Sequence, residues 1–243
     1  MMVSAPLLVF VAAVTGQATA FTTTPRTSTF ATALHATTEA FSVGEEFANE
    51  AALFEASTFP ISPEKLKERA KEVLSPEIAL GTQDGGDCLA DNFEFCAAVV
   101  GPIGKQEYLN ALGTFKLQDG FDLRNNHFGM TVDPLQPNRI WLFSRIRAIH
   151  TGTFMGVEPS GKEIVYPPQI QHIDFDEQGK VVEFGFYTAD RRQGNTGGLG
   201  GAFGFMYGVG KPLPIPECQP YKPSKRFRFL MFLGSLGRRF QKK

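Results

Sequence analysis

The spacing of apolar residues changes along the chain, from a helical period in the first half to a strand period in the second. Residues 41–57 carry Phe and Ala at helical spacing, and Ser62-Pro63 begin a second helix with a hydroxyl N-cap and a proline at the first helical position. Lys105–Phe115 form a third predicted helix with its apolar residues on one side. The glycines and aspartates of residues 81–87 indicate a loop between the last two helices.

After Asp122 the apolar period becomes two, which is typical of strands. The predicted strands are Asn126–Val132, Arg139–Thr153, Ile164–Asp174 and Lys180–Ala189, with a shorter one, Phe93–Val100, before the third helix. Residues 133–138 and 176–179 supply the Pro, Asn, Asp and Gly that turns need. Helices followed by a run of antiparallel strands predict the α+β class.

The composition indicates a globular domain and excludes several kinds of partner and structural site. The 243 residues are 42% apolar and 12% aromatic, and 24 basic against 25 acidic residues give a net charge of −1. This balance excludes a chain built as a whole around a nucleic-acid backbone, and we expect no nucleic-acid partner. Three cysteines without a C-x-x-C motif exclude a disulfide scaffold and a structural zinc site.

No motif for a metal or a cofactor is present, so we expect neither. The four histidines form no H-E-x-x-H pair, and the serines include no G-x-S-x-G elbow. The Gly-rich residues 197–204 resemble a nucleotide loop, but Phe203 takes the place of the last glycine. This segment is either an aromatic flap or membrane-facing loop, or a flexible linker to the tail.

The first forty residues have the composition of a targeting leader. Residues 1–20 hold an uncharged apolar run that ends in Ala18-Thr19-Ala20, which fits the cleavage pattern of a signal peptide; an uncleaved membrane anchor is the alternative. Residues 21–40 are rich in Ser and Thr, and the first acid of the chain is Glu39, as in organelle transit peptides. With Phe21 directly after the cleavage site, the leader resembles the bipartite presequence of algae with complex plastids, which implies a plastid (chloroplast) location.

The other end of the chain is basic. No acid follows Glu217, and residues 222–243 carry cations on both sides of the apolar run Phe229–Leu233. Such a pattern favours an anionic membrane surface, here that of the plastid. The alternative is a tail that packs its Phe and Leu side chains against its own domain.

Several motifs in order resemble the SnoaL-like branch of the nuclear transport factor 2-like superfamily. They are His150-Thr151-Gly152, Pro159-Ser160-Gly161-Lys162, a Gly179-Lys180-Val181-Val182-Glu183 hairpin, and a strand-end Asp190. The resemblance implies a cone-shaped curved antiparallel sheet packed on N-terminal helices around an apolar pocket. It divides the chain into an N-terminal extension (41–62), the SnoaL-like domain (63–192) and a Gly/Phe-rich segment with the basic tail (193–243).

The same resemblance implies acid–base residues at the pocket. Asp190 is near the position of the family's proton-transferring Asp, where burial beside Phe would raise the carboxyl pKa. The alternative is an exposed strand end at which Asp190 pairs with Arg191 or Arg192. His150 matches the family turn, and His172 is the candidate for the family's strand histidine. On its own strand, however, His172 shares a face with Asp174, opposite the apolar face, and is expected to be outward and solvated.

Four further side chains are candidates for ligand binding. Phe184 and Phe186 alternate with polar positions and would form an apolar pocket wall, whereas Trp141 and Arg145 share a face of an earlier strand. Arg145 could hold a carboxylate-bearing ligand. The alternative is an outer face whose arginines pair with acids on adjacent strands.

The sequence therefore leaves two classes of function open. One is a non-catalytic plastid protein. It would bind a hydrophobic small molecule in a pocket, or act as an assembly module near membranes that forms a homodimer through its sheet. The other is an acid–base isomerase, cyclase or dehydratase acting on a hydrophobic small molecule. Fold resemblance alone does not decide between them.

Overall fold

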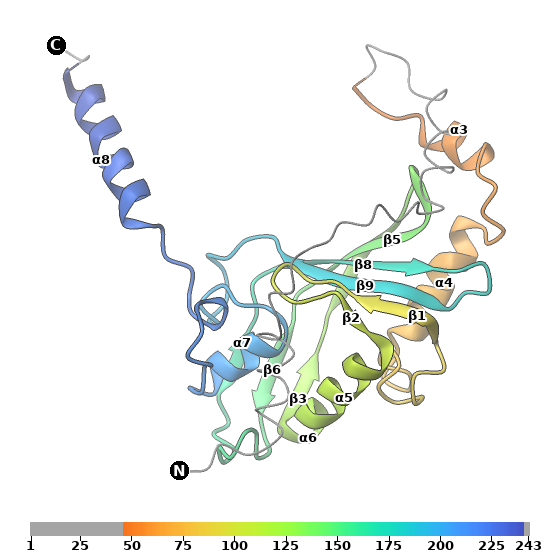
Figure 1. Ribbon diagram of the computed structural model, residues 1–243, viewed down its shortest axis with the longest axis horizontal. Helices are drawn as coiled ribbons and strands as arrows, with labels where there is room; N and C mark the ends of the chain where they lie inside the picture. Colours follow the sequence, from red (N-terminus) through yellow and green to blue (C-terminus); the bar gives the residue numbers. More distant parts are fainter. Residues whose placement is uncertain (1–45, 241–243) are drawn as a thin grey trace, which may run out of the picture.

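The structure, a computed structural model, describes residues 46–240, so the predicted leader in residues 1–40 lies outside the described residues (Figure 1). The helices are α3 (Glu50–Glu55), α4 (Pro63–Val73), α5 (Lys105–Phe115), α6 (Leu117–Gly120), α7 (Gly201–Gly208) and α8 (Lys225–Phe240), with a 3-10 turn, η2 (Pro216–Cys218). The strands are β1 (Leu89–Phe95), β2 (Ile103–Gly104), β3 (Phe121–Arg124), β4 (His127–Asp133), β5 (Gln136–Ser144), β6 (Arg147–His150), β7 (Glu163–Val165), β8 (Gln169–Phe175) and β9 (Val181–Thr188).

The strands form two sheets. The larger sheet has the order β2-β1-β9-β8-β5-β4, and the smaller has the order β3-β6-β7. All pairs are antiparallel except β1 with β9, which is parallel. The sheet is therefore mixed, and with its packed helices it confirms the predicted α+β class.

The two central helices follow from their caps and apolar stripes. At the start of α4 the Ser62 hydroxyl accepts a hydrogen bond from the Lys65 amide, and Pro63 occupies the first turn. Three residues at helical spacing, Leu66, Ala70 and Val73, are fully buried. Helix α5 has the predicted bounds Lys105–Phe115. The helix predicted over residues 41–57 is seen only as the short α3 within the described part of the chain.

Two of the predicted strands are each divided in two. The predicted strand Arg139–Thr153 becomes β5 and β6 in different sheets, because the chain turns at Arg145, whose amide donates to the carbonyl oxygens of Asn125 and Asn126. The predicted strand Ile164–Asp174 becomes β7 and β8, separated by Pro167-Pro168. Proline has no amide hydrogen for a strand ladder, so pairing stops at this point. The two-residue spacing of apolar positions did not predict either of these two breaks in the strands.

The interior consists of two apolar clusters. The first packs α4 and α5 against the larger sheet and includes Leu66, Tyr108, Leu142, Ile173 and Phe184. The second lies between the smaller sheet and α7, and its larger members are Phe115, Phe121, Phe154, Tyr166, Phe203, Phe205 and Met206. We call the face of the larger sheet that carries Leu142, Ile173 and Phe184 the inner face. Ile173 and Phe184 lie on the strand faces that were predicted to be inward, and the burial of Leu142 shows which of the two open faces of β5 is the inner one.

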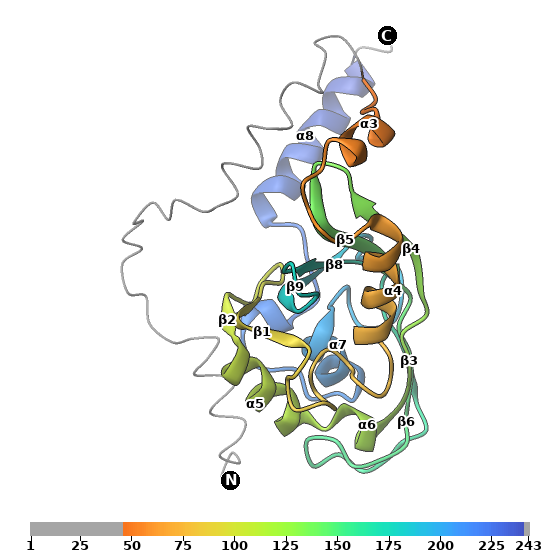
Figure 2. The same cartoon turned by 90° about the vertical axis from the view of Figure 1, so that its right-hand side faces the viewer.

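Helix α7 is built from the Gly-rich segment and is packed inside the protein. Figure 1 shows it toward the opposite end of the molecule from α4, and in Figure 2 it lies within the outline of the surrounding strands and helices. Phe203, Phe205 and Met206 are buried. A Cβ placed on Gly204 would lie 2.6 Å from the Tyr166 ring, and one on Gly208 would lie 2.6 Å from Ile164. Only glycine permits this close approach, so the segment is a packed helix and not the alternative flexible linker.

Helix α8 projects away from the rest of the protein (Figure 1). Phe229, Leu230 and Phe232 are each more than half exposed. The alternative in which the tail packs its Phe and Leu side chains on its own domain is therefore wrong for these residues. None of the helices between residues 46 and 240 combines the length and the hydropathy that a transmembrane helix requires.

Candidate functional site

A row of polar side chains crosses the inner face of the larger sheet between the two apolar clusters. His127 on β4 pairs with Ser144 on β5, Ser144 with Gln169 on β8, and Gln169 with Thr188 on β9. Residues directly opposite each other point to the same face, so the four side chains share the inner face. Gln171, two residues along β8, faces the same way, and its amide donates to the Ser144 hydroxyl at 3.3 Å. We call these five residues the polar seam.

The seam lies at the boundary between the clusters on each central strand. Ser144 is the last residue of β5: it follows Leu142, a member of the first cluster, and Ile146, a member of the second cluster, comes two residues after it, between β5 and β6. On β8, Ile173 belongs to the first cluster, and Gln171 and Gln169 follow it on the same face toward the other end of the strand. The seam is therefore one row of polar groups with apolar packing on both sides.

Several atoms of the seam are buried without a hydrogen-bond partner. Gln169 is 1% exposed and Gln171 is 6% exposed. Nε2 of Gln169, Oε1 of Gln171 and both ring nitrogens of His127 have no partner in the structure. Buried polar groups in native proteins are nearly always paired, and each unpaired one costs about 1–3 kcal/mol. Burial also lowers the pKa of His127, so the imidazole is neutral and offers one donor and one acceptor near pH 7.

The start of α7 lies directly against the seam. A Cβ placed on Gly200 would lie 2.4 Å from Nε2 of Gln169 and 3.3 Å from Oγ1 of Thr188, and one on Gly201 would lie 2.4 Å from the Phe186 ring. The resemblance implied an apolar pocket beside Phe186. The structure places the backbone of α7 there instead, and the second apolar cluster beyond it.

Depressions formed by residues 46–240 are found away from the seam. One of about 230 Å³ lies between Phe54, Phe59, Ile61 and Pro137, and one of about 220 Å³ lies between Arg145, Arg147, Tyr166 and Gln193. Neither is lined by a residue of the polar seam. In the second depression Arg145 donates to Gln193, and Arg147 forms an ion pair with Glu163. Arg147 thus pairs with an acid on an adjacent strand, as the alternative expected, whereas Arg145 is engaged by the neutral Gln193.

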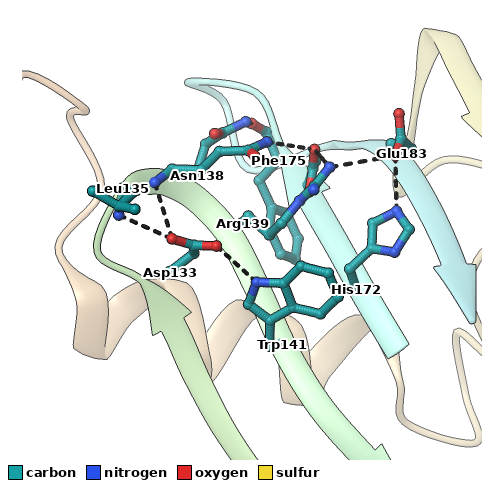
Figure 3. Close-up of polar contacts among 10 residues, drawn as sticks. Asp133, Leu135, Asn138, Arg139, Trp141, His172, Phe175 and Glu183 are labelled. Carbon is teal, nitrogen blue, oxygen red and sulfur yellow. Dashed lines mark hydrogen bonds and ion pairs between the residues drawn. The ribbon is translucent and has the colours of Figure 1, made fainter. Parts of the chain in front are cut away.

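The outer face of the same strands carries a second polar cluster, shown in Figure 3. Arg139 donates from Nε and Nη2 to the two carboxylate oxygens of Asp174, at 2.6 Å each, and from Nη2 to Glu183 at 3.3 Å. Glu183 also contacts Nε2 of His172 at 2.8 Å, and Gln136 donates to Asp174 at 2.9 Å. We call these five residues the ionic network.

The pKa values of the two carboxyl groups in the network shift in opposite directions. The hydrogen bond from His172 lowers the pKa of Glu183, helped by the charge of Arg139. Burial raises the pKa of Asp174 against the opposing effect of Arg139, because Asp174 is 1% exposed. Removing the charge of Arg139 or of Asp174 would therefore leave the other member of this ion pair in a poorly solvated environment.

The predicted catalytic residues lie in three separate places. Asp190 follows β9 and accepts hydrogen bonds from Arg192 and Gln193, which lower its pKa instead of raising it as expected for a base buried beside Phe. His150 on β6 is fully buried, contacts the Ser160 hydroxyl at 3.1 Å and packs on Phe121. Within the described part of the chain, Asp190, His150 and His172 each have other partners, and no hydrogen bond or ring contact joins any two of them. Their catalytic assignment stays a prediction.

The orientation of His172 was predicted correctly, but its environment was not. It lies on the outer face, where it stacks on Tyr187 with ring centroids 5.8 Å apart and contacts Trp141 at 5.5 Å. It is 1% exposed, so the expected solvated position is wrong. The covering rings explain the burial. Gly185, directly opposite on β9, also allows the ring to lie flat, since a Cβ there would be 2.4 Å from the imidazole.

The predicted ligand-binding residues divide between the two faces. Phe184 and Phe186 lie on the inner face, where Phe184 belongs to the first apolar cluster and Phe186 borders the seam. Trp141 lies on the outer face, where its indole donates to Asp133 at 2.8 Å, and Arg145 lies at the turn between β5 and β6. The four residues therefore do not line one site. None of the five seam residues was among the predicted site residues, although Gln171 lies on a strand face that was predicted to be inward.

The described cysteines and acidic residues form neither a reactive thiol site nor a metal site. Burial raises the pKa of Cys88 to about 12 and that of Cys218 to about 11, so both thiols are protonated near pH 7. Among the residues that the structure describes, no group of three or more His, Cys, Asp or Glu is placed to hold a metal ion.

Comparisons with known proteins find similarity in structure only. No family model matches the chain, and no curated protein matches it. AclR from Streptomyces galilaeus, provisionally described as a hydroxylase, is similar at a TM-score of 0.45 and 16% identity, over 75% of this chain and 99% of that one. A SnoaL-like protein from Jannaschia sp. CCS1, provisionally described as a polyketide cyclase, is similar at a TM-score of 0.40 and 22% identity, over 55% and 89%.

A third similar structure is IdmH from Streptomyces antibioticus, also provisionally described as a polyketide cyclase. Its TM-score is 0.41 and its identity 12%, over 51% of this chain and 92% of that one. Identities of 12–22% and TM-scores below 0.5 do not transfer an activity to this chain. Its function is therefore argued from its own residues.

Proposed function

We propose that this protein binds a hydrophobic small molecule that carries a small hydrogen-bonding group, and that the polar seam recognises this group. The observation that carries the proposal is the set of buried seam atoms without partners: Nε2 of Gln169, Oε1 of Gln171 and the ring nitrogens of His127. Together they offer donors and acceptors within one row of the inner face. A ligand oxygen that accepts from Gln169 and a ligand hydroxyl that donates to Gln171 would satisfy two of them.

The position of the seam supports the hydrophobic character of the ligand. Apolar clusters lie on both sides of it, with Leu142 and Ile173 on one side and Ile146 on the other. A molecule whose polar group reached the seam would have its body against these clusters. Burial of that apolar surface would contribute about 25 cal/mol per Å² to affinity.

Access to the seam is controlled by the start of α7. Gly200 lies against Gln169, and Gly201 lies against Phe186. A ligand that reached Gln169 would have to displace this backbone. The preceding residues Gly194, Gly197 and Gly198 have φ values between 68° and 83°, a conformation that glycine adopts without strain. We infer that α7 covers the site as a closed lid.

Acid–base catalysis, the alternative function, has less support. A general base that works near neutral pH needs a raised carboxyl pKa, and the hydrogen bonds from Arg192 and Gln193 lower that of Asp190. His150 and His172 lie on different sheets. We therefore propose binding without acid–base chemistry by these three residues.

A plastid location is proposed from the leader alone. It rests on the signal-like residues 1–20, the hydroxyl-rich residues 21–40 and Phe21 at their junction. A fluorescent protein fused after residue 40 should accumulate in the plastid of an alga with complex plastids. Replacement of Phe21 by Ala should retain the fusion outside the plastid, and unchanged import would contradict the bipartite interpretation.

Ligand binding can be tested by native mass spectrometry of protein expressed in and purified from its native cells. We expect an additional mass that is lost on denaturation. Gln171→Leu removes a seam acceptor and should lower its occupancy at least about tenfold, the effect of about 1.4 kcal/mol. Gln178→Leu, at an exposed turn position, is the matched control and should retain the mass. No additional mass, or equal occupancy in both variants, would contradict the proposal.

A further inference from the structure

Helix α8 presents an apolar surface that no part of the described chain covers. Phe227, Phe229, Leu230 and Phe232 are 54–66% exposed, and Met231 and Leu233 are 52% and 46% exposed. Phe229, Phe232 and Leu233 are three and four residues apart and share one side of the helix. Large contiguous apolar surfaces of this kind mark interaction sites.

The charges around this surface are all of one sign. Lys222, Lys225, Arg226 and Arg228 precede or begin the apolar run, and in the sequence Arg238, Arg239, Lys242 and Lys243 follow it. No acid occurs after Glu217. A partner for this helix must therefore combine negative charge with an apolar layer beneath it.

The length of α8 suits a helix that lies on the surface of a bilayer and not one that crosses it. Its 16 residues rise about 24 Å as a helix, less than the roughly 30 Å hydrocarbon core of a bilayer. Its start is fixed by Ser224, whose hydroxyl accepts from the Phe227 amide. The residues before the helix, 219–224, form neither helix nor strand and hold it away from the sheets (Figure 1). The helix can therefore reach a flat surface without a clash from the domain.

We propose that α8 binds the surface of a bilayer that contains anionic lipids. Its Phe and Leu side chains enter the boundary between headgroups and acyl chains, and its Lys and Arg side chains contact the anionic headgroups. A protein partner would have to supply the same negative charge around an apolar groove. The bilayer is the simpler occupant, because it offers both over any area. This inference is independent of ligand binding at the seam.

The test is co-sedimentation of the full chain with phosphatidylcholine vesicles, with and without about 30% phosphatidylglycerol, a content that gives a negative surface potential. We expect binding to the anionic vesicles that exceeds binding to neutral vesicles at least about tenfold and weakens with salt. The double substitution Arg226→Glu with Arg228→Glu should lower binding at least about 30-fold. Each basic residue near the headgroups contributes about 1 kcal/mol, and 1.4 kcal/mol is tenfold.

A second variant tests the apolar side chains. Phe229→Ser with Phe232→Ser and Leu233→Ser should also lower binding to anionic vesicles at least about tenfold, because burial of each large apolar side chain contributes to affinity. The matched control reverses two exposed charges of α4, Lys65→Glu with Lys71→Glu, and should bind as the original chain does. Residues 1–40 are the same in every variant, so the apolar run of the leader contributes equally throughout.

Three outcomes would overturn the proposal. The first is equal binding to neutral and anionic vesicles, and the second is an equal loss in the α4 control. The third is a dimer in size-exclusion chromatography with light scattering that disappears in the apolar variant while vesicle binding is absent. That third result would identify a second copy of the chain as the occupant of α8.

Discussion

The two faces of the larger sheet carry polar clusters that differ in how well they are satisfied. On the outer face, Arg139 donates hydrogen bonds to both Asp174 and Glu183, and among the described atoms of the network only Nδ1 of His172 is buried without a partner. On the inner face, Gln169, Gln171 and His127 each contain at least one such atom. The same strands, β5, β8 and β9, supply both clusters.

This difference indicates different roles. A network whose charged groups are paired with one another holds strands together and has little capacity left for another molecule. A row of unsatisfied groups is costly to the empty protein, and such groups in native structures need an explanation in a bound molecule or water. We therefore assign the outer network to stability and the inner seam to recognition.

The largest effect is expected from loss of a charge in the ionic network. Arg139→Met should lower the free energy of unfolding by about 3–5 kcal/mol, because it leaves the buried Asp174 without its ion-pair partner. Urea denaturation followed by circular dichroism would measure this loss. The control Arg147→Met breaks an exposed pair with Glu163 and should cost less than about 1 kcal/mol. Similar losses in the two variants would contradict a structural role specific to the network.

The next effect concerns α7, which covers the seam. Gly204→Ala should lower the free energy of unfolding by about 1–3 kcal/mol, because the new methyl group would lie 2.6 Å from the Tyr166 ring. Gly113→Ala is the matched control in α5, where a Cβ meets nothing within 4 Å, and it should gain up to about 1 kcal/mol. Thermal unfolding of the two variants would compare them. A gain for both would mean that α7 does not pack on the sheet.

A pair of glutamine substitutions compares the two faces directly. Gln136→Leu on the outer face removes a hydrogen bond to Asp174 and should cost about 1.5–3 kcal/mol of unfolding free energy. Gln171→Leu in the seam removes an unpartnered oxygen together with one weak bond, and should change the stability of ligand-free protein by about 1 kcal/mol or less. Denaturant titration would measure both. A larger cost for Gln171→Leu would show that the seam is structural.

The smallest effect is a dependence of stability on pH. Burial lowers the pKa of His127 in the folded protein, so below the unfolded value of about 6.5 the unfolded chain binds more protons. Stability should therefore fall as pH decreases from 7 to 5.5, by less than about 1.4 kcal/mol per pH unit. His127→Gln should make this part of the profile flatter. Glu183 affects stability in a separate pH range. Its pKa is lowered in the folded protein, so its contribution to the free energy of unfolding is lost only as pH falls below about 4.5.

Much of the fold could be predicted from local patterns. The cap at Ser62-Pro63 gave the start of α4, and the apolar period gave the bounds of α5. The division of one predicted strand at Arg145 could not be predicted, because it depends on hydrogen bonds to Asn125 and Asn126 from a distant part of the chain. The alternation of apolar and polar residues within a strand does not indicate which sheet that strand joins.

The candidate site was harder to predict than the fold. The face of β8 that carries Gln171 was predicted to be inward, but local sequence does not show that a polar side chain on an apolar face is buried without a partner. The importance of the seam residues depends on the cross-strand register, which places Ser144 beside Gln169 and His127. The position of Gly200 against Gln169 depends likewise on the packing of α7.

Binding of a small molecule at the polar seam would be visible in a high-resolution crystal structure of protein purified from its native cells. We expect continuous density for an organic molecule within hydrogen-bond distance of Gln169 Nε2 and Gln171 Oε1, with the start of α7 displaced from Gln169. Density for isolated waters alone at these atoms, with α7 in place, would contradict it.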